Sequence, residues 1–149
     1  MRLEDFLEKD FVLHDLAARS KTEALSELAA PLGRKWPTLD TAKAVRVLLE
    51  RETLGSTGIG EGLAIPHGKM DELEQIVIVA GRSLPGVNFD ALDAKPCHIF
   101  FLVMAPEKVV GLHLRILAHI SRLLADESFK KAFMNAQGQD GLWEFLSGY

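Results

Sequence analysis

Two segments in the first third of the chain carry apolar residues at helical spacing. In residues 20–30, "SKTEALSELAA", Ser20 and Glu23 form an S-x-x-E capping box ahead of the first apolar position. Residues 40–52, "DTAKAVRVLLERE", repeat the helical spacing. We expect Gly33 to end the first of these helices, because glycine is common just beyond a helix C-terminus.

The middle of the chain has strand patterns instead. Residues 76–84, "IVIVAGRSL", are rich in β-branched residues and predict a strand, and we expect Pro85 and Gly86 to turn the chain after it. Residues 97–104, "CHIFFLVM", are apolar on both faces, which is typical of an inner strand covered on both sides. Residues 63–65, "LAI", predict a short extended piece.

The remainder of the chain is predicted to be helical. Residues 109–125 predict a long helix, Asp126 is a plausible N-cap for the next one, and "QDGLWEFLSGY" predicts a short final helix. No repeat, low-complexity segment or linker interrupts the chain, so we expect one domain over residues 1–149. Helices mixed with strands in this order predict the α/β class, with a central sheet between helical layers.

Composition limits the class of protein, the partners and the compartment that can be expected. The 149 residues are 48% apolar and 26% charged, as in an ordinary globular protein. A net charge of −4, without any long basic run, argues against nucleic acid as a partner. The single Cys97 rules out an intramolecular disulfide and is expected to be a buried structural thiol. No signal peptide and no membrane segment is visible, and we expect a cytoplasmic protein.

The stretch "GIGEGLAIPHGK", residues 58–69, carries the clearest candidate chemistry. Pro66 has a fixed φ and favours an extended Ile65, while Gly68 leaves the backbone free, so His67 projects in a defined direction. The loop before it can bind an anion through free N–H groups or can simply be a tight turn, and its spacing matches no nucleotide-binding motif. The glycines of this loop are Gly55, Gly58, Gly60 and Gly62.

Two histidines on the long helix are separated by its geometry. Arg115, His119, Arg122 and Asp126 share one polar stripe, so we expect His119 to be solvated. His113 projects from the opposite side, in the first turn, where helix N–H groups suit an anion. The alternative for His113 is a buried histidine bonded to a backbone carbonyl.

Arg51 closes the helix just before the glycine loop. Its planar guanidinium can bind a phosphate, although a cation at a helix C-terminus is also favourable without any ligand. A neutral imidazole at His67 has a lone pair that can attack phosphorus. We expect no metal, since the chain has no HExxH, no cysteine pair and no carboxylate at ligand spacing from His67. Together these residues suggest an oxyanion site.

Two strings resemble signatures of one known family. "ERETLGSTGIGEGLAIPHGK", residues 50–69, is similar to the active-site signature of the fructose/mannitol-type IIA proteins of the bacterial phosphoenolpyruvate-dependent phosphotransferase system (PTS). "HLRILAHISRLLAD", residues 113–126, resembles the second-histidine helix of that family. The resemblance covers essentially the whole chain, and it is strongest to the nitrogen-regulatory branch.

The resemblance implies a mannitol-type IIA fold, a mixed sheet flanked by helices on both faces. It also implies that His67 accepts a phosphoryl group on Nε2 from the phosphohistidine of an HPr-type carrier protein, with no cofactor. His113 would hydrogen-bond the imidazole or the phosphoryl group, and Arg51 would balance its charge. The residues expected to complete the phosphate site are Ser56, Thr57 and Gly68.

Three functions follow as expectations. The first is a phosphoryl relay whose phosphorylation state regulates protein targets in nitrogen or general metabolism. The second is the IIA component of fructose or mannitol uptake, which passes phosphate to a IIB subunit. The third, from another class, is a non-catalytic binding module. Glu61 would repel a phosphoryl group if it pointed into the site, and we expect it to point outward.

Overall fold

The computed structural model describes residues 1–149. The α-helices are α1 (Lys21–Lys35), α2 (Thr41–Thr53), α3 (Val110–Leu124), α4 (Glu127–Asn135) and α5 (Gly138–Leu146). Short 3-10 turns are η1 (Leu3–Asp5), η2 (Lys9–Phe11) and η3 (Glu107–Val109). The strands are β1 (Val12–Leu13), β2 (Gly58–Gly60), β3 (Leu63–Ala64), β4 (His67–Lys69), β5 (Val77–Val87) and β6 (Cys97–Ala105).

The strands form one mixed sheet in the order β1-β5-β6-β3-β2, and β4 pairs with β6 beyond the end of β3. β5 runs antiparallel to β6, whereas β3 and β4 both run parallel to it. β6 therefore has a partner on each side along most of its length. This central place explains why its sequence is apolar on both faces, as the pattern predicted.

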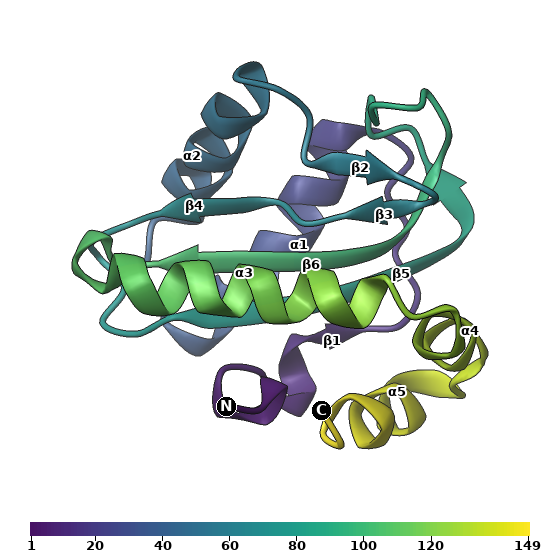
Figure 1. Cartoon of the computed structure of the whole chain (residues 1–149). Coiled ribbons are helices and arrows are strands. Elements are labelled where there is room, and N and C mark those ends of the chain that lie inside the picture. The colour runs from purple at the N-terminus through teal and green to yellow at the C-terminus, as the bar shows by residue number, and fades with distance from the viewer.

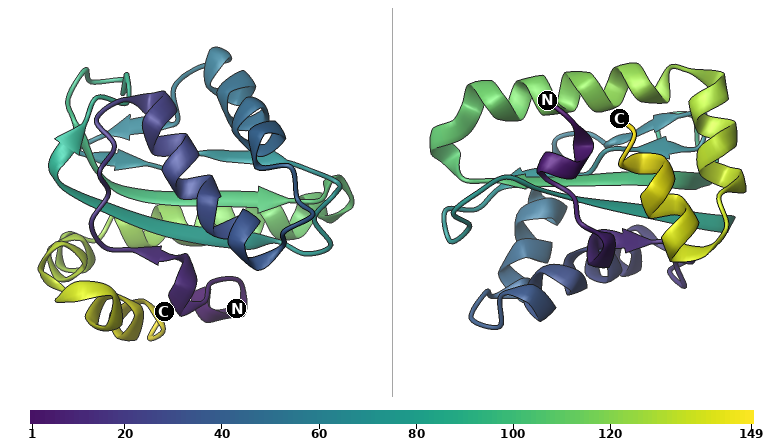
Figure 2. Two further views of the ribbon diagram at one scale, coloured as in Figure 1. Left: turned by 180° about the vertical axis from the view of Figure 1, so that it is seen from behind. Right: turned by 90° about the horizontal axis from the view of Figure 1, so that it is seen from below.

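Helices cover both faces of the sheet. α3 lies across one face, and α1 and α2 lie across the other, as the two views from behind and below show (Figures 1 and 2). α4 and α5 pack at one side, where α5 contacts β1, and the two termini end near one another. The α/β class and the covering on both faces are thus confirmed. None of the helices has the length and apolar character needed to cross a membrane.

The first helix is longer than predicted. α1 passes through Pro31 and Gly33 and ends at Lys35. A proline inside a helix is unfavourable, but Leu28 and Leu32 on the same helix are completely buried, and this packing outweighs the local cost. Gly33 has a different role from the one predicted. A Cβ there would lie 2.6 Å from the Thr41 side chain, so the glycine allows α2 to begin close against α1.

The strand β5 also continues beyond its predicted end. Pro85 and Gly86 do not turn the chain out of the sheet, because the pairing with β6 resumes at Val87 after a register shift. Gly86 has a φ of +97°, and its N–H donates to the Ser83 hydroxyl at 3.0 Å. The two residues therefore form a bulge, which is a common place for glycine and proline within a strand.

A buried arginine joins the sheet to the C-terminal helices. Arg82 on β5 is only 4% exposed, and its Nε donates to the His14 carbonyl at 3.0 Å. Its Nη1 donates to the carbonyls of Phe133 at 2.9 Å and Ala136 at 2.7 Å. These carbonyls belong to the last turn of α4 and the residue after it, where carbonyls lack partners within the helix. Arg82 therefore acts as the cap of α4.

We predict that Arg82→Met lowers the free energy of unfolding by about 3 kcal/mol, because it leaves buried carbonyls without a donor. Urea denaturation followed by circular dichroism measures this change. Arg122→Met, on the exposed side of α3, is the control and should stay within about 0.5 kcal/mol of the wild type. Equal effects of the two substitutions would contradict the capping role.

Candidate functional site

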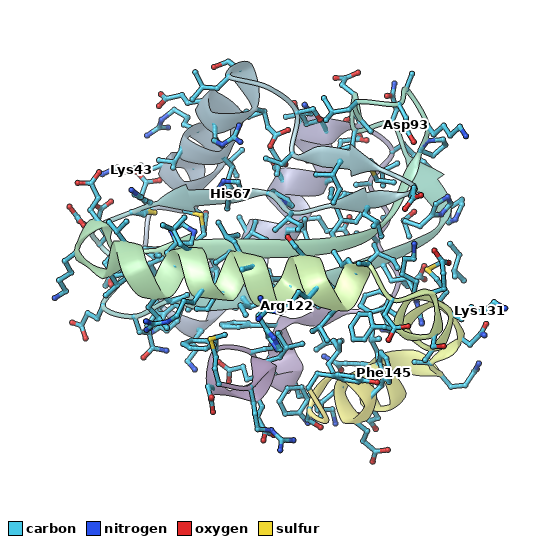
Figure 3. All side chains as sticks on the ribbon, viewed as in Figure 1. Lys43, His67, Asp93, Arg122, Lys131 and Phe145 are labelled. Atoms are coloured by element: carbon cyan, nitrogen blue, oxygen red, sulfur yellow. The ribbon has the colours of Figure 1, made fainter.

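His67 is the first residue of β4 and lies between α2 and α3 (Figure 3). β3 ends at Ala64 and β4 begins at His67, and both pair with β6. Pro66 lies in the break between them and is buried, and its carbonyl accepts from the Val103 N–H at 2.9 Å. The backbone on both sides of the break is therefore fixed to the central strand. This arrangement gives His67 the stiff direction that the sequence predicted.

The ring of His67 is bonded through one nitrogen to its own loop. Nδ1 lies 2.8 Å from the carbonyl oxygen of Ile65. Since a carbonyl oxygen only accepts, Nδ1 carries the proton and donates it, and in the neutral ring the lone pair is then on Nε2. The half-buried His67 is thus held in the tautomer whose Nε2 is nucleophilic.

His113 lies beside His67, as the helix-face argument predicted. It is 5% exposed, and the two rings are 6.0 Å apart between centroids at an interplanar angle of 82°. Its Nε2 is buried and has no hydrogen-bond partner in the protein. Burial lowers the pKa of His113, and His67 and Lys69 lower it further by repelling a second positive charge. The lowered pKa favours the neutral form of the His113 ring.

His119 lies away from this pair. It is half-buried, and its Nε2 lies 3.2 Å from the carbonyl oxygen of Tyr149. Arg115 and Arg122 on the same stripe are exposed, as expected, but the C-terminal residue covers part of His119. Its partial burial was not predictable, because it depends on where α5 brings the end of the chain.

An open cavity of about 640 Å³ contains the two histidines. Arg51 also lines it, and its Nη1 donates to the Gly55 carbonyl at 3.0 Å, which leaves its other N–H groups available. Lys69 adds a second positive charge that the sequence did not single out, and Leu54 on the rim is 83% exposed. The remaining lining residues are Val47, Glu50 and Gly68. The cavity therefore combines cations with a nucleophilic imidazole.

Gly68 is explained by packing. A Cβ at this position would lie 2.8 Å from Cγ1 of Val47 on α2. The glycine therefore allows α2 to approach β4 closely, and this contact brings the C-terminal turn of α2, with Arg51, to the cavity. Its expected role in phosphate binding stays a prediction.

Ser56 and Thr57 are not among the residues that line the cavity. The Ser56 hydroxyl donates to the Phe89 carbonyl at 3.4 Å and accepts from the Gly58 N–H at 3.1 Å. Thr57 is buried, and both its N–H and its hydroxyl donate to the carboxylate of Glu52. Their hydroxyls thus shape the glycine loop, and the phosphate role expected of them remains an untested prediction.

Sequence reasoning did not single out Glu52. The residue is 8% exposed and follows Ala44 and Leu48 at spacings of four residues on the buried face of α2. A carboxylate in line with an apolar stripe was the available signal, since buried charges require partners.

Glu61 points away from the cavity. Glu61 and Gly62 have φ values of 56° and 79° and form the turn between β2 and β3, as in a type I′ hairpin. The Glu61 carboxylate is 79% exposed and lies 3.6 Å from Nζ of Lys130 on α4. This turn lies toward α4, at the opposite end of the sheet from β4 (Figure 1). The outward orientation expected from the sequence is confirmed.

Two other residues with reactive side chains, Cys97 and His98, are explained by their places in the fold. Cys97 is completely buried, and burial raises the pKa of its thiol to about 11, which suppresses the nucleophilic thiolate. His98 donates from Nδ1 to the Ser83 carbonyl at 2.8 Å. No three His, Cys, Asp or Glu side chains gather closely enough to hold a metal ion.

Comparison with known proteins finds relatives of this chain. A nitrogen regulatory protein of Bradyrhizobium diazoefficiens is 36% identical over 99% of this chain and 95% of its own length. A fructose-specific EIIABC component of Bacillus subtilis is 31% identical over 99% of this chain, which spans 23% of that protein.

A solved structure has the same fold. The crystal structure of nitrogen regulatory protein IIA-Ntr from Neisseria meningitidis superposes with a TM-score of 0.87 at 30% identity, covering 95% of this chain and 97% of that one. The model of the family "Phosphoenolpyruvate-dependent sugar phosphotransferase system, EIIA 2" matches residues 5–149. The chain therefore belongs to the EIIA type 2 family of the phosphoenolpyruvate-dependent phosphotransferase system, and it is a phosphoryl-relay protein of the IIA type.

Proposed function

We propose that His67 is the phosphoryl acceptor of this relay and that residues 1–149 act as one cytoplasmic domain. The observation that carries the proposal is the bond from Nδ1 of His67 to the Ile65 carbonyl. It reserves Nε2 as the nucleophile inside a cavity that contains two cationic side chains, Arg51 and Lys69. The donor is a phosphohistidine on an HPr-type carrier protein.

The transfer needs no cofactor. Nε2 of neutral His67 attacks phosphorus, the N–P bond of the donor breaks, and its electron pair returns to the donor imidazole. The phosphorylated ring of His67 becomes positively charged, and its Nδ1 keeps its proton. The Ile65 carbonyl accepts that proton's hydrogen bond at 2.8 Å and stabilises the charge without moving.

His113 and Arg51 stabilise the phosphoryl oxygens. A neutral His113 protonated on Nε2 can donate there, and a phosphoryl oxygen supplies the partner that this buried nitrogen lacks within the protein. Arg51 keeps free N–H groups beside its bond to Gly55 and can donate to a second oxygen. A binding module without chemistry would have no use for an unpaired buried nitrogen, which argues against the non-catalytic alternative.

We further propose that the phosphorylation state regulates protein targets, and the relative from Bradyrhizobium diazoefficiens is named a nitrogen regulatory protein. The chain matches 95% of that relative at 36% identity, which favours the regulatory function. The alternative is sugar uptake with transfer to a IIB subunit, which the fructose-specific relative keeps open. Transfer of labelled phosphate from this protein to a fructose-type IIB domain would favour the alternative.

We predict that incubation with phosphoenolpyruvate, enzyme I and HPr labels the protein with one acid-labile, base-stable phosphate. His67→Ala should remove the label completely, because it removes the nitrogen that accepts the phosphoryl group in this proposal. Intact mass and peptide mapping under basic conditions measure the result. An unlabelled wild type, or a labelled His67→Ala variant, contradicts the proposal.

The two α3 histidines form a matched pair. His113→Ala should slow phosphorylation of His67 by about 100-fold, as expected for loss of one preorganised donor. His119→Ala should change the rate less than about twofold, because His119 bonds only the C-terminal carbonyl among protein groups. Phosphorylation reactions stopped at a series of times give both rates. A large effect of His119→Ala with little effect of His113→Ala would overturn the assignment.

Phosphorylation should raise the pKa of His113. In the unphosphorylated protein this pKa is lowered mainly by burial and further by the positive charge of Lys69. A phosphoryl dianion beside the ring favours its charged form and acts in the opposite direction. Titration of the His113 ring by NMR in both states measures the change. A pKa that is unchanged or lower after phosphorylation would show that the group lies elsewhere.

A further inference from the structure

A chain of hydrogen bonds links the buried carboxylate of Glu52 to the ring of His67. We propose that Glu52 is a positioning residue: through the glycine loop it fixes the tautomer and the direction of His67. This inference rests on the proposed function for its consequence in catalysis. Its structural part concerns the unphosphorylated protein and can be tested without any transfer.

The first part of the chain is the carboxylate itself. Oε1 of Glu52 accepts from the Thr57 N–H at 3.0 Å and lies 3.0 Å from Nζ of Lys21, and Oε2 accepts from the Thr57 hydroxyl. The ammonium of Lys21 also lies 5.0 Å from the ring centre of Phe89. Both carboxylate oxygens are thus paired, as a buried charge requires. α1, α2 and the glycine loop meet at this one group.

The second part runs through the backbone. The Thr57 carbonyl accepts from the Ile65 N–H at 3.1 Å, and the Ile65 carbonyl accepts from Nδ1 of His67 at 2.8 Å. Thr57 and Ile65 are 4% and 7% exposed, so water does not compete freely for these groups. The peptide groups of Ile65 are therefore oriented by the loop that Glu52 holds, and that orientation selects the proton position on His67.

A carboxylate is required at position 52 because three donor groups need acceptor oxygens there. Glu52 serves an N–H, a hydroxyl and an ammonium with two oxygens. A glutamine replaces one of the two oxygens with an NH₂ donor, so one Thr57 donor would face another donor, and it loses the charge that pairs with Lys21. With the loop released, the Ile65 carbonyl drifts and Nδ1 loses its acceptor. The Nε2–H tautomer then becomes populated, and its Nε2 has no lone pair for attack.

The test measures the tautomer directly. In protein labelled with ¹⁵N-histidine at a pH of about 8.5, where a histidine ring is neutral, the ring nitrogen shifts of His67 report the proton position. Wild type should be mainly Nδ1–H, whereas Glu52→Gln should show a mixture of both forms. Phosphorylation of the Glu52→Gln variant by phospho-HPr should be at least about tenfold slower than that of the wild type, because displacement of a reacting atom slows a reaction.

Two further variants keep the test open if Glu52→Gln folds poorly. Thr57→Val removes only the hydroxyl bond and should shift the tautomer in the same direction by a smaller amount. Thr57→Ser keeps that bond, so this variant should show the wild-type tautomer and the wild-type rate of phosphorylation. The proposal would be overturned if the Thr57→Val variant and the Glu52→Gln variant both showed the wild-type tautomer and the wild-type rate of phosphorylation.

Glu27→Gln is the matched control. Glu27 also holds a loop by accepting backbone N–H groups, from Ala17 at 3.0 Å and Ala18 at 2.9 Å. The substitution should lower stability without changing the His67 tautomer. An equal tautomer shift in Glu27→Gln would mean general loosening and would refute a specific positioning role. A wild type that shows the tautomer but is never phosphorylated would refute the proposed function alone.

Discussion

The hydrogen bond from Nδ1 of His67 to the Ile65 carbonyl is the constraint on which the site depends. It forms in the two-residue break between β3 and β4, where Ile65 and Pro66 lie between two stretches that pair with β6 in one unbroken register. The Pro66 carbonyl still accepts from the Val103 N–H on β6, whereas the Ile65 carbonyl accepts from the ring two residues later. The ring gains a fixed tautomer from this bond.

The layers of the fold bring the other groups to this ring. α3 covers one face and presents the buried His113 from its first turn, while α2 covers the other and carries Arg51 in its last turn. Gly68 allows α2 to lie close to β4. His113 and Arg51 therefore converge on His67 from separate elements, each held by packing that does not depend on the ligand. Such preorganised electrostatics suit the transfer of a charged group.

The sequence was sufficient for much of this picture. The inner strand, the α/β class and the face of α3 that carries His113 follow from periodicity, which depends on local geometry alone. The fixed φ of Pro66 is a local rule of the same kind, and the pairing of β4 with β6 completes the direction of His67. These predictions are confirmed because local preference and tertiary packing agree at each of these positions.

Predictions were wrong or incomplete where distant segments decide. Gly33 and Gly86 suggested breaks, but one accommodates a neighbouring helix and the other a bulge inside a strand. The donors of Thr57 are bonded to Glu52, whose burial depends on how α2 packs, and the phosphate role expected of Thr57 stays a prediction. No local sequence pattern shows which group will form a hydrogen bond with a given hydroxyl.

The most direct test of the account is the position of the phosphorus atom in the phosphorylated protein. With ¹⁵N-histidine labelling, one-bond coupling between ³¹P and a ring nitrogen identifies the nitrogen that carries the phosphoryl group. The account predicts coupling to Nε2 of His67 and a proton retained on Nδ1, bonded to Ile65. Coupling to Nδ1 of His67, or to either nitrogen of His113, would contradict it.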